Sequence, residues 1–290
     1  MLEVKISGKD LLIEGVDFSI TFDKTEGWFK SYRNKESELL ESPLKPNFWR
    51  APIDNDFGNG MPERCSIWKG LHKSFKISNF EYSQSDAGLV IVKTEYDIEE
   101  IDTDAKINYK IYSDGTIKVS SRFDLLKKDL PEIPRIGFSV HIKNEFSNFK
   151  YFGRGPHENY IDRNTAARVS LYKSTVQEQF VPYSRPQENG YRTDVRWAEL
   201  HNKNGIGIKI FGCDRFGTSV LHYTQEQLDP GLEKKNRHPV ELEARDFIEW
   251  HIDLKQMGVG GDNSWGATPH KEYMIYPGIY NFDFVIQPLE

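Results

Sequence analysis

The sequence predicts an all-β protein, a large antiparallel sandwich of two sheets with long ordered loops. Apolar and polar residues alternate over several segments of strand length. Aromatic residues, which favour strands, make up 13% of the chain, and 22 glycines and 14 prolines supply turns. Helical signals are few and short. Residues 1–290 are therefore expected to form a single domain, because no change in composition supports the alternative, a division near residue 145.

The N-terminal segment is expected to form a β-meander. Phe18, Ile20 and Phe22 alternate with polar residues, so one face of a strand would be buried and the other exposed. Residues 24–27 (KTEG) are then expected to turn the chain.

Residues 47–60 show no periodicity and are rich in turn formers, which predicts an ordered loop. Asp54, Asn55 and Asp56 in this loop could bind calcium. However, Gly58 and Cys65 occupy positions at which an EF-hand needs oxygen ligands, so a turn is the favoured interpretation.

The clearest hairpin is expected at residues 105–125. Two alternating segments flank Asp114 and Gly115, the residue pair that supplies positive φ for a tight turn. Further strands are predicted around residues 206–210 and 279–286.

Two short helical segments are predicted. Residues 174–180 could form one or two turns. Thr224 followed by Gln227 resembles a capping box, in which the two side chains satisfy backbone donors at a helix start.

Composition and charge argue against two classes of partner. The net charge is −6 and no basic run is present, which argues against nucleic acid. No apolar stretch approaches the roughly 20 residues of a membrane helix, and the first residues do not resemble a signal peptide. Cys65 and Cys213 are too few for a disulfide framework, and the sequence leaves open both their pairing and the compartment, cytoplasmic or periplasmic.

Three loops carry the polar and aromatic residues of a candidate site. Residues 153–163 (GRGPHENYIDR) could place an acid and a base, or could form a network of arginine–carboxylate pairs, which is the favoured interpretation. Residues 182–192 combine aromatic, amide and charged side chains, as carbohydrate contacts do. Residues 258–266 (GVGGDNSWG) form a glycine-rich loop, whose backbone is free to take positive φ angles and tight bends. Zinc-type His spacing, GxSxG and phosphate-loop motifs are absent from the sequence.

Four motifs together resemble the C-terminal region (domain 5, or small chain) of the β-galactosidases of glycoside hydrolase family 2. They are residues 47–56 (NFWRAPIDND), 153–163, 186–190 (PQENG) and 258–265. They occur in the family's order and span nearly the whole chain, so the resemblance is more specific than any single motif.

The resemblance implies a large antiparallel supersandwich, similar to galactose mutarotase. It also implies a role in hydrolysing β-galactosides beside a separate catalytic barrel or large subunit, with Trp265 stacking on the sugar at the rim. Asn263, where the family often has Asp, and His157 and Glu158 are further candidate substrate contacts.

The resemblance also implies what this chain lacks. Retaining hydrolysis needs two carboxyl groups about 5–5.5 Å apart. In the family both glutamates, and the Mg²⁺ ligands, come from the barrel. No catalytic, metal-binding or cofactor-binding residue is therefore assigned to this chain, which is expected to be inactive alone and to join any homo-oligomer through the parent enzyme.

Two other functions stay open at this point. A free-standing aldose epimerase would use His157 and Glu158 as acid and base. A carbohydrate-binding module would bind galactose or lactose through Trp265.

Overall fold

The computed structural model describes residues 1–234, 237–263 and 265–290, and most of its elements are antiparallel strands. A five-stranded sheet has the order β1-β2-β3-β4-β5. Its strands are β1 (Glu3–Ser7), β2 (Asp10–Glu14), β3 (Phe18–Asp23), β4 (Phe29–Asn34) and β5 (Ser37–Glu38). The predicted strand at Phe18, Ile20 and Phe22 is confirmed, because all three side chains are buried on one face of β3.

The second sheet has twelve strands. Its main path runs β13-β12-β14-β15-β17-β10-β9-β8-β7, and β16, β11 and β6 follow one another as a branch from β15. The strands are β6 (Lys45–Asn47), β7 (Phe75–Asp86), β8 (Leu89–Ile98), β9 (Thr103–Tyr112), β10 (Ile117–Asp124), β11 (Arg135–Lys143), β12 (Asn148–Gly155), β13 (Arg168–Thr175), β14 (Arg192–His201), β15 (Gly207–Leu221), β16 (Phe247–Gln256) and β17 (Ile279–Leu289). The predicted hairpin is β9–β10, with Gly115 at a φ of 83°.

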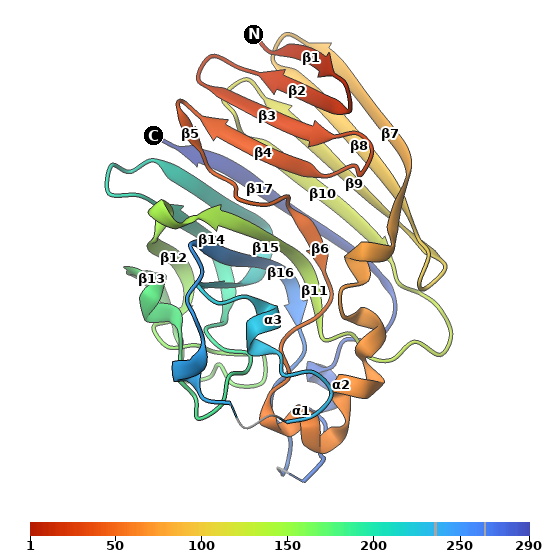
Figure 1. Ribbon diagram of the computed structural model, residues 1–290, viewed down its shortest axis with the longest axis vertical. Helices are drawn as coiled ribbons and strands as arrows, with labels where there is room; N and C mark the ends of the chain where they lie inside the picture. Colours follow the sequence, from red (N-terminus) through yellow and green to blue (C-terminus); the bar gives the residue numbers. More distant parts are fainter. Residues whose placement is uncertain (235–236, 264) are drawn as a thin grey trace.

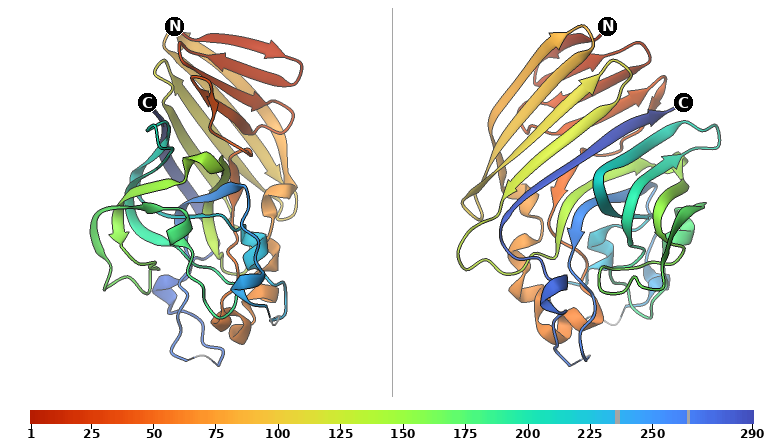
Figure 2. Two further views of the ribbon diagram at one scale, coloured as in Figure 1. Left: turned by 60° about the vertical axis from the view of Figure 1, so that its left-hand side comes forward. Right: turned by 180° about the vertical axis from the view of Figure 1, so that it is seen from behind.

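The small sheet lies as a second layer over the β7–β10 part of the large sheet, and the other half of the large sheet curls around (Figures 1 and 2). Aromatic rings fill the space between the layers. Phe22 meets Tyr109 edge-on with centroids 4.9 Å apart, and Trp28 stacks on Tyr96 at 4.6 Å. The Tyr32 hydroxyl donates to the Gly115 carbonyl at 2.6 Å, so the hairpin tip is tied to the small sheet. The all-β, antiparallel prediction is therefore confirmed.

The helices are short. They are α1 (Asp54–Asn59), α2 (Met61–Arg64) and α3 (Gln225–Leu228), with 3₁₀ turns at Ser66–Trp68, Leu71–Ser74, Asn144–Phe146, Gln177–Gln179, Pro239–Glu241 and Lys271–Tyr273. The capping box is confirmed, because the Gln227 amide donates to the Thr224 hydroxyl and the Thr224 amide donates to the Gln227 side chain. The prediction of one or two turns within residues 174–180 is confirmed in part, since β13 continues to Thr175 and a single 3₁₀ turn follows at Gln177–Gln179.

The prediction of a loop and turn over residues 47–60 was wrong at its C-terminal end. Residues 54–59 form α1 instead. The Asp56 carboxylate accepts a hydrogen bond from the Ile53 amide at 2.8 Å, which satisfies a free donor at the helix start. Residues that favour turns also favour helix N-termini, so composition alone did not distinguish the two.

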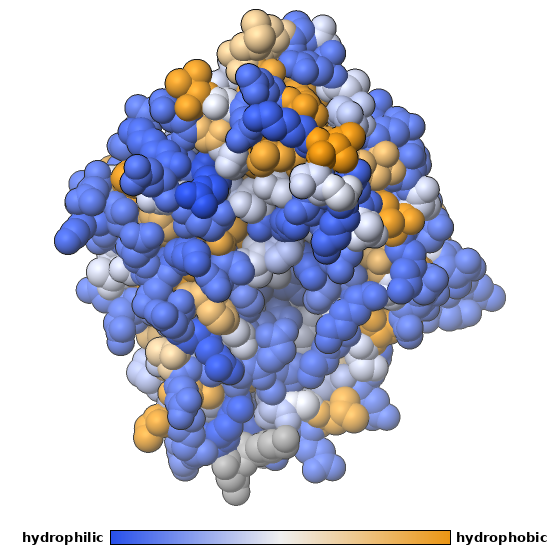
Figure 3. Space-filling model, turned by 45° about the horizontal axis from the view of Figure 1, so that its top comes forward, coloured by the Kyte–Doolittle hydropathy of each residue, from blue (hydrophilic) through white to orange (hydrophobic). Residues whose placement is uncertain are grey.

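Both termini lie at one end of the molecule, and α1, α2 and the loop after β16 lie at the other (Figure 1). The face in Figure 3 is mostly hydrophilic and is hollowed near its middle.

Cys65 is buried, Cys213 is exposed, and both thiols are free. Within the described residues, no helix has the length and apolarity to cross a membrane.

Candidate functional site

The four sequence motifs converge on one pocket of about 400 Å³ at the α1 end. Each motif contributes to its lining, although the motifs are far apart in the chain. The lining residues are Ile53, Asp54, Asn55, Tyr160, Asp162, Arg163, Tyr183, Gln187, Glu188, Val259 and Gly260. We call this cavity the four-motif pocket.

Arg50 fastens the first motif to the last. Its side chain is fully buried and binds the Asp56 carboxylate through both terminal nitrogens, at 2.5 and 3.0 Å. The same guanidinium donates to the Gly258 carbonyl at 3.3 Å. A bidentate pair of this kind fixes orientation as well as position. Arg50 therefore holds the start of the 258–266 loop close to α1.

Asp162 fastens the second motif to the same loop. Its Oδ2 atom accepts a hydrogen bond from the Gly260 amide at 2.6 Å. A Cβ atom at Gly258 would lie 2.6 Å from this carboxylate, and one at Gly260 would lie 3.1 Å from it. A side chain at Gly258 would therefore force Asp162 to shift, and one at Gly260 would fit only if Asp162 moved slightly.

Of the four glycines of this loop, Gly266 uses its freedom to adopt positive φ, with a φ of 124°. At Gly261 a Cβ atom would lie 2.7 Å from the Ala267 carbonyl oxygen, and at Gly266 it would lie 2.9 Å from that of Gly58. Most of these glycines permit close packing, which a one-dimensional pattern does not distinguish from backbone flexibility.

Trp265 projects from this loop with 91% of its surface exposed. Its backbone amide donates to the Asn263 side-chain oxygen at 2.8 Å, so Asn263 orders the backbone next to the Trp. Both residues lie on the loop whose first residues line the four-motif pocket. Ser264, between them in the motif, lies outside the described residues.

His157 and Glu158 are not paired with each other by any hydrogen bond or ion pair between described residues. His157 is exposed. Glu158 is instead bound by the Arg163 guanidinium at 2.7 Å, the Tyr183 hydroxyl, and the Gly190 amide at 2.8 Å. The interpretation of residues 153–163 as an ion-pair network is therefore confirmed at Glu158, which holds two side chains of the pocket wall in place.

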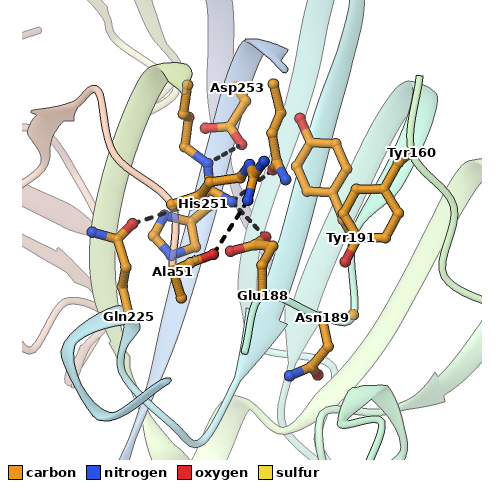
Figure 4. A network of polar contacts seen from close by, with 12 residues as sticks. Ala51, Tyr160, Glu188, Asn189, Tyr191, Gln225, His251 and Asp253 are labelled. Atoms are coloured by element: carbon orange, nitrogen blue, oxygen red, sulfur yellow. Dashed lines mark hydrogen bonds and ion pairs between the residues drawn. The ribbon is translucent and has the colours of Figure 1, made fainter. Parts of the chain in front are cut away.

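Glu188 lines the pocket. It also belongs to a buried network of polar contacts (Figure 4). Arg135, which is fully buried, contacts Glu188 at 2.7 Å, Asp253 at 3.2 Å and the Gln256 side-chain oxygen at 2.7 Å. Tyr191 and Tyr160 stack beside the network at 5.7 Å. The Arg135 guanidinium is thus ion-paired with two buried carboxylates, those of Glu188 and Asp253.

Two carboxylates of this interior have opposite pKa shifts. Burial raises the pKa of Asp253 to about 6, although Arg135 opposes the rise. Burial would also raise the pKa of Glu249, but hydrogen bonds from His141 and His251 outweigh it and lower that pKa to about 2. The difference follows from hydrogen bonding, since Glu249 accepts bonds from His141, His251 and the Gln225 amide, which outweigh its burial, whereas the interactions of Asp253 do not outweigh its burial.

The pocket lining is chemically mixed. Tyr183, Ile53 and Val259 offer apolar surface, while Asp162 and Gln187 offer planar polar groups. Such combinations bind small organic ligands. In the part of the chain that the structure describes, no three His, Cys, Asp or Glu side chains are grouped as a metal site requires.

Four residues of the site were not predicted from the sequence, namely Asp162, Arg50, Arg135 and Glu188. Each lies in a motif or a strand, but its partner is distant in sequence, as with Arg50 and Gly258 or Arg135 and Glu188. A buried cation must find an opposite charge. Arg50 and Arg135 lie within otherwise apolar segments of the sequence. This pattern could have indicated buried cations with distant partners.

The family described as "Beta galactosidase small chain" matches residues 14–286. A β-galactosidase from Priestia megaterium is 37% identical over 289 residues, and one from Halalkalibacterium halodurans is 32% identical over 266 residues. These matches cover 99% and 91% of this chain but only 27% and 26% of the two relatives. The chain thus spans about a quarter of the length of these relatives.

Two solved structures align with the chain at low sequence identity. An α-N-acetylgalactosaminidase from Bifidobacterium bifidum aligns with a TM-score of 0.51 and 11% identity, over 96% of this chain and 36% of that one. A galactose mutarotase related enzyme from Lactobacillus acidophilus aligns with a TM-score of 0.48 and 9% identity, over 96% and 97% of the two chains. From the family match and the two relatives, we conclude that the chain belongs to the β-galactosidase small chain family.

Proposed function

We propose that this chain, acting as one domain, is the non-catalytic C-terminal region or small subunit of a retaining β-galactosidase. The observation that carries the proposal is the convergence of all four family motifs on one pocket, together with an exposed Trp on the loop that supplies Val259 and Gly260 to that pocket. Residues that serve only the core would be distributed through the core. Here parts of the motifs are buried, but two or more residues of every motif line a surface cavity at the end away from the termini.

Trp265 contributes an aromatic face at the rim of the sugar-binding site. A Trp with 91% exposure adds almost nothing to the core of this chain, so its contacts are expected with a ligand or a partner. Arg50 and Asp162 hold the base of the loop that carries this ring. Asn263 supports the backbone next to it.

The catalytic carboxyl pair and Mg²⁺ belong to the barrel domain or large subunit, which is the expected partner. The galactoside then binds between the two parts. His157 lies on the outer surface of the second motif and would meet the partner or the substrate there.

Complementation tests this proposal. The purified chain is mixed with a fragment of a full-length relative that contains the catalytic barrel and lacks the matched C-terminal quarter. Hydrolysis of a chromogenic β-galactoside is expected from the mixture and from neither component alone. Strong hydrolysis by the chain alone, or no rescue by a mixture that forms a complex, would contradict the proposal.

The epimerase alternative requires an available acid and base. Glu158 is engaged by Arg163, Tyr183 and Gly190, and His157 does not contact it. Polarimetry on α-galactose is expected to give the mutarotation rate of the buffer alone.

A further inference from the structure

Backbone contacts join the two sides of the loop that carries Trp265. The Gly258 amide donates to the Tyr273 carbonyl at 2.8 Å, near the points where the chain enters and leaves the loop. A Cβ atom at Gly261 would lie 2.7 Å from the Ala267 carbonyl oxygen, so the two sides are also close together nearer to Trp265. Because the Trp265 ring is 91% exposed, the path of this backbone decides where the ring lies.

One pair of side chains also crosses the loop. The His270 Nε2 atom lies 2.8 Å from the Asp262 Oδ1 atom. Asp262 precedes Trp265 in the chain and His270 follows it, so the contact joins the segment before the ring to the segment after it. The contact is an ion pair when His270 is protonated, and it then limits how far the two segments can separate.

The charges near His270 favour its protonated form. Besides Asp262, the Glu272 carboxylate lies 3.8 Å from the His270 Nδ1 atom. The hydrogen bond with Asp262, together with the charges of Asp262 and Glu272, raises the pKa of His270 above its ordinary value of 6.5. The ion pair is therefore complete below pH 6.5 and is lost as the pH rises through the raised value.

The elements packed against the loop supply no other ionic partner for His270. Gly266 packs against Gly58 of α1, and Gly260 is bonded to Asp162 of the second motif. Within the described residues, His270 is ion-paired with Asp262 and Glu272 alone. The other charged groups considered are Asp54, Asp56, Glu63 and Arg64 of α1 and α2, Asp162, and Lys271 next to His270.

We propose that His270 is a positioning residue for Trp265. Its ion pair with Asp262 draws the two sides of the loop together, and the loop loosens when His270 loses its proton. The effect on substrate binding rests on the proposed function. The closure of the loop is a property of this chain alone and is measured without the partner.

Two-dimensional NMR of the intact chain between about pH 5 and 9 tests the closure. The backbone amide signals of Gly261 and Ala267 and the indole N–H signal of Trp265 are expected to shift with the midpoint of the His270 ring, above pH 6.5. In His270→Gln these shifts are expected to disappear, because the side chain no longer titrates.

Two further variants separate charge from shape. His270→Lys keeps a cation opposite Asp262 and is expected to hold the low-pH signals across the whole range. His238→Gln is the matched control, since His238 is exposed and lies outside the loop, and it should leave the titration unchanged. Thermal unfolding is expected to give the same melting temperature for all variants, because the pair is exposed.

The KM of the complemented enzyme for a chromogenic β-galactoside tests the effect on binding. At pH 6 the KM of His270→Gln is expected to exceed that of wild type by about two- to fivefold, as the loss of an exposed ion pair allows. Above the His270 midpoint this ratio should fall to about 1. Taking the ratio removes the titration of the partner's groups. His270→Lys should keep the low KM at every pH.

Two results would overturn the inference. One is that the Gly261 and Ala267 signals ignore the His270 titration or titrate equally in His270→Gln. The other is a KM ratio of about 1 at every pH in a mixture that hydrolyses the galactoside, which removes the positioning role while the proposed function stands. If complementation itself fails, the proposed function is wrong and the NMR titration decides the closure.

Discussion

The Asp162 carboxylate accepts a 2.6 Å hydrogen bond from the backbone amide of Gly260, which joins two motifs that lie 98 positions apart. This bond fixes the base of the loop that carries Trp265. The same carboxylate leaves no room for a side chain at Gly258. The position of the loop and its packing thus both depend on Asp162.

Gly258→Ala is expected to destabilise the chain by about 1–3 kcal/mol, because the added methyl group would overlap Asp162. Denaturant unfolding measures the change. Gly278→Ala is the control, since a Cβ atom there has no neighbour closer than 3.5 Å. If steric overlap is the cause, Asp162→Ala relieves part of the loss. If the double variant loses as much unfolding free energy as Gly258→Ala and Asp162→Ala together, steric overlap is not the cause.

Trp265→Ala is expected to weaken substrate binding by the complemented enzyme by about 1–3 kcal/mol, as loss of one stacking ring does. The effect should appear mainly as a raised KM. The melting temperature should stay unchanged, because the ring is 91% exposed. Val240→Ala removes an equally exposed apolar side chain, at 90%, and should change neither quantity. A Trp265 variant with a normal KM would remove Trp265 from the site.

Arg135→Met is expected to lower the free energy of unfolding by about 3–5 kcal/mol, since it leaves the Glu188 and Asp253 carboxylates buried without their cation. Lys106→Met removes a cation from an exposed pair with Glu95 and should cost about 0–1 kcal/mol. Urea titration of both variants checks the contrast. Equal costs would mean that the buried network contributes no more than a surface pair.

Glu249 should make stability depend on acid pH. Its pKa is lowered from 4.5 to about 2 in the folded chain, so the folded state binds fewer protons than the unfolded state between these values. This contribution is fully present above pH 4.5 and is lost as the pH falls toward 2. Glu249→Gln is expected to lower the free energy of unfolding by about 3 kcal/mol near neutral pH.

The gap in unfolding free energy between wild type and Glu249→Gln should close on acidification. Glu95→Gln, at a side chain with 42% exposure, is the control and should show no such gap. A gap that stays constant from neutral to acid pH would show that Glu249 does not titrate with a lowered pKa.

Local patterns were sufficient for the strands. Alternation identified β3, β9, β10 and β17, because each has one face against the core and a side-chain period of two. The capping box at Thr224 was also readable, since its partner lies three residues away. The same kind of reasoning failed at α1, where Asp56 stabilises a helix start and not a turn.

By itself, the sequence determined the fold class, the family and the four segments that line the pocket. Only the tertiary structure decided which residues within those segments meet. Arg50 reaches Gly258, Asp162 reaches Gly260 and Arg135 reaches Glu188 because the curled sheet brings distant loops to one end. Strand periodicity depends on neighbours along the chain, whereas these contacts depend on how the whole sheet closes, and no local pattern records that.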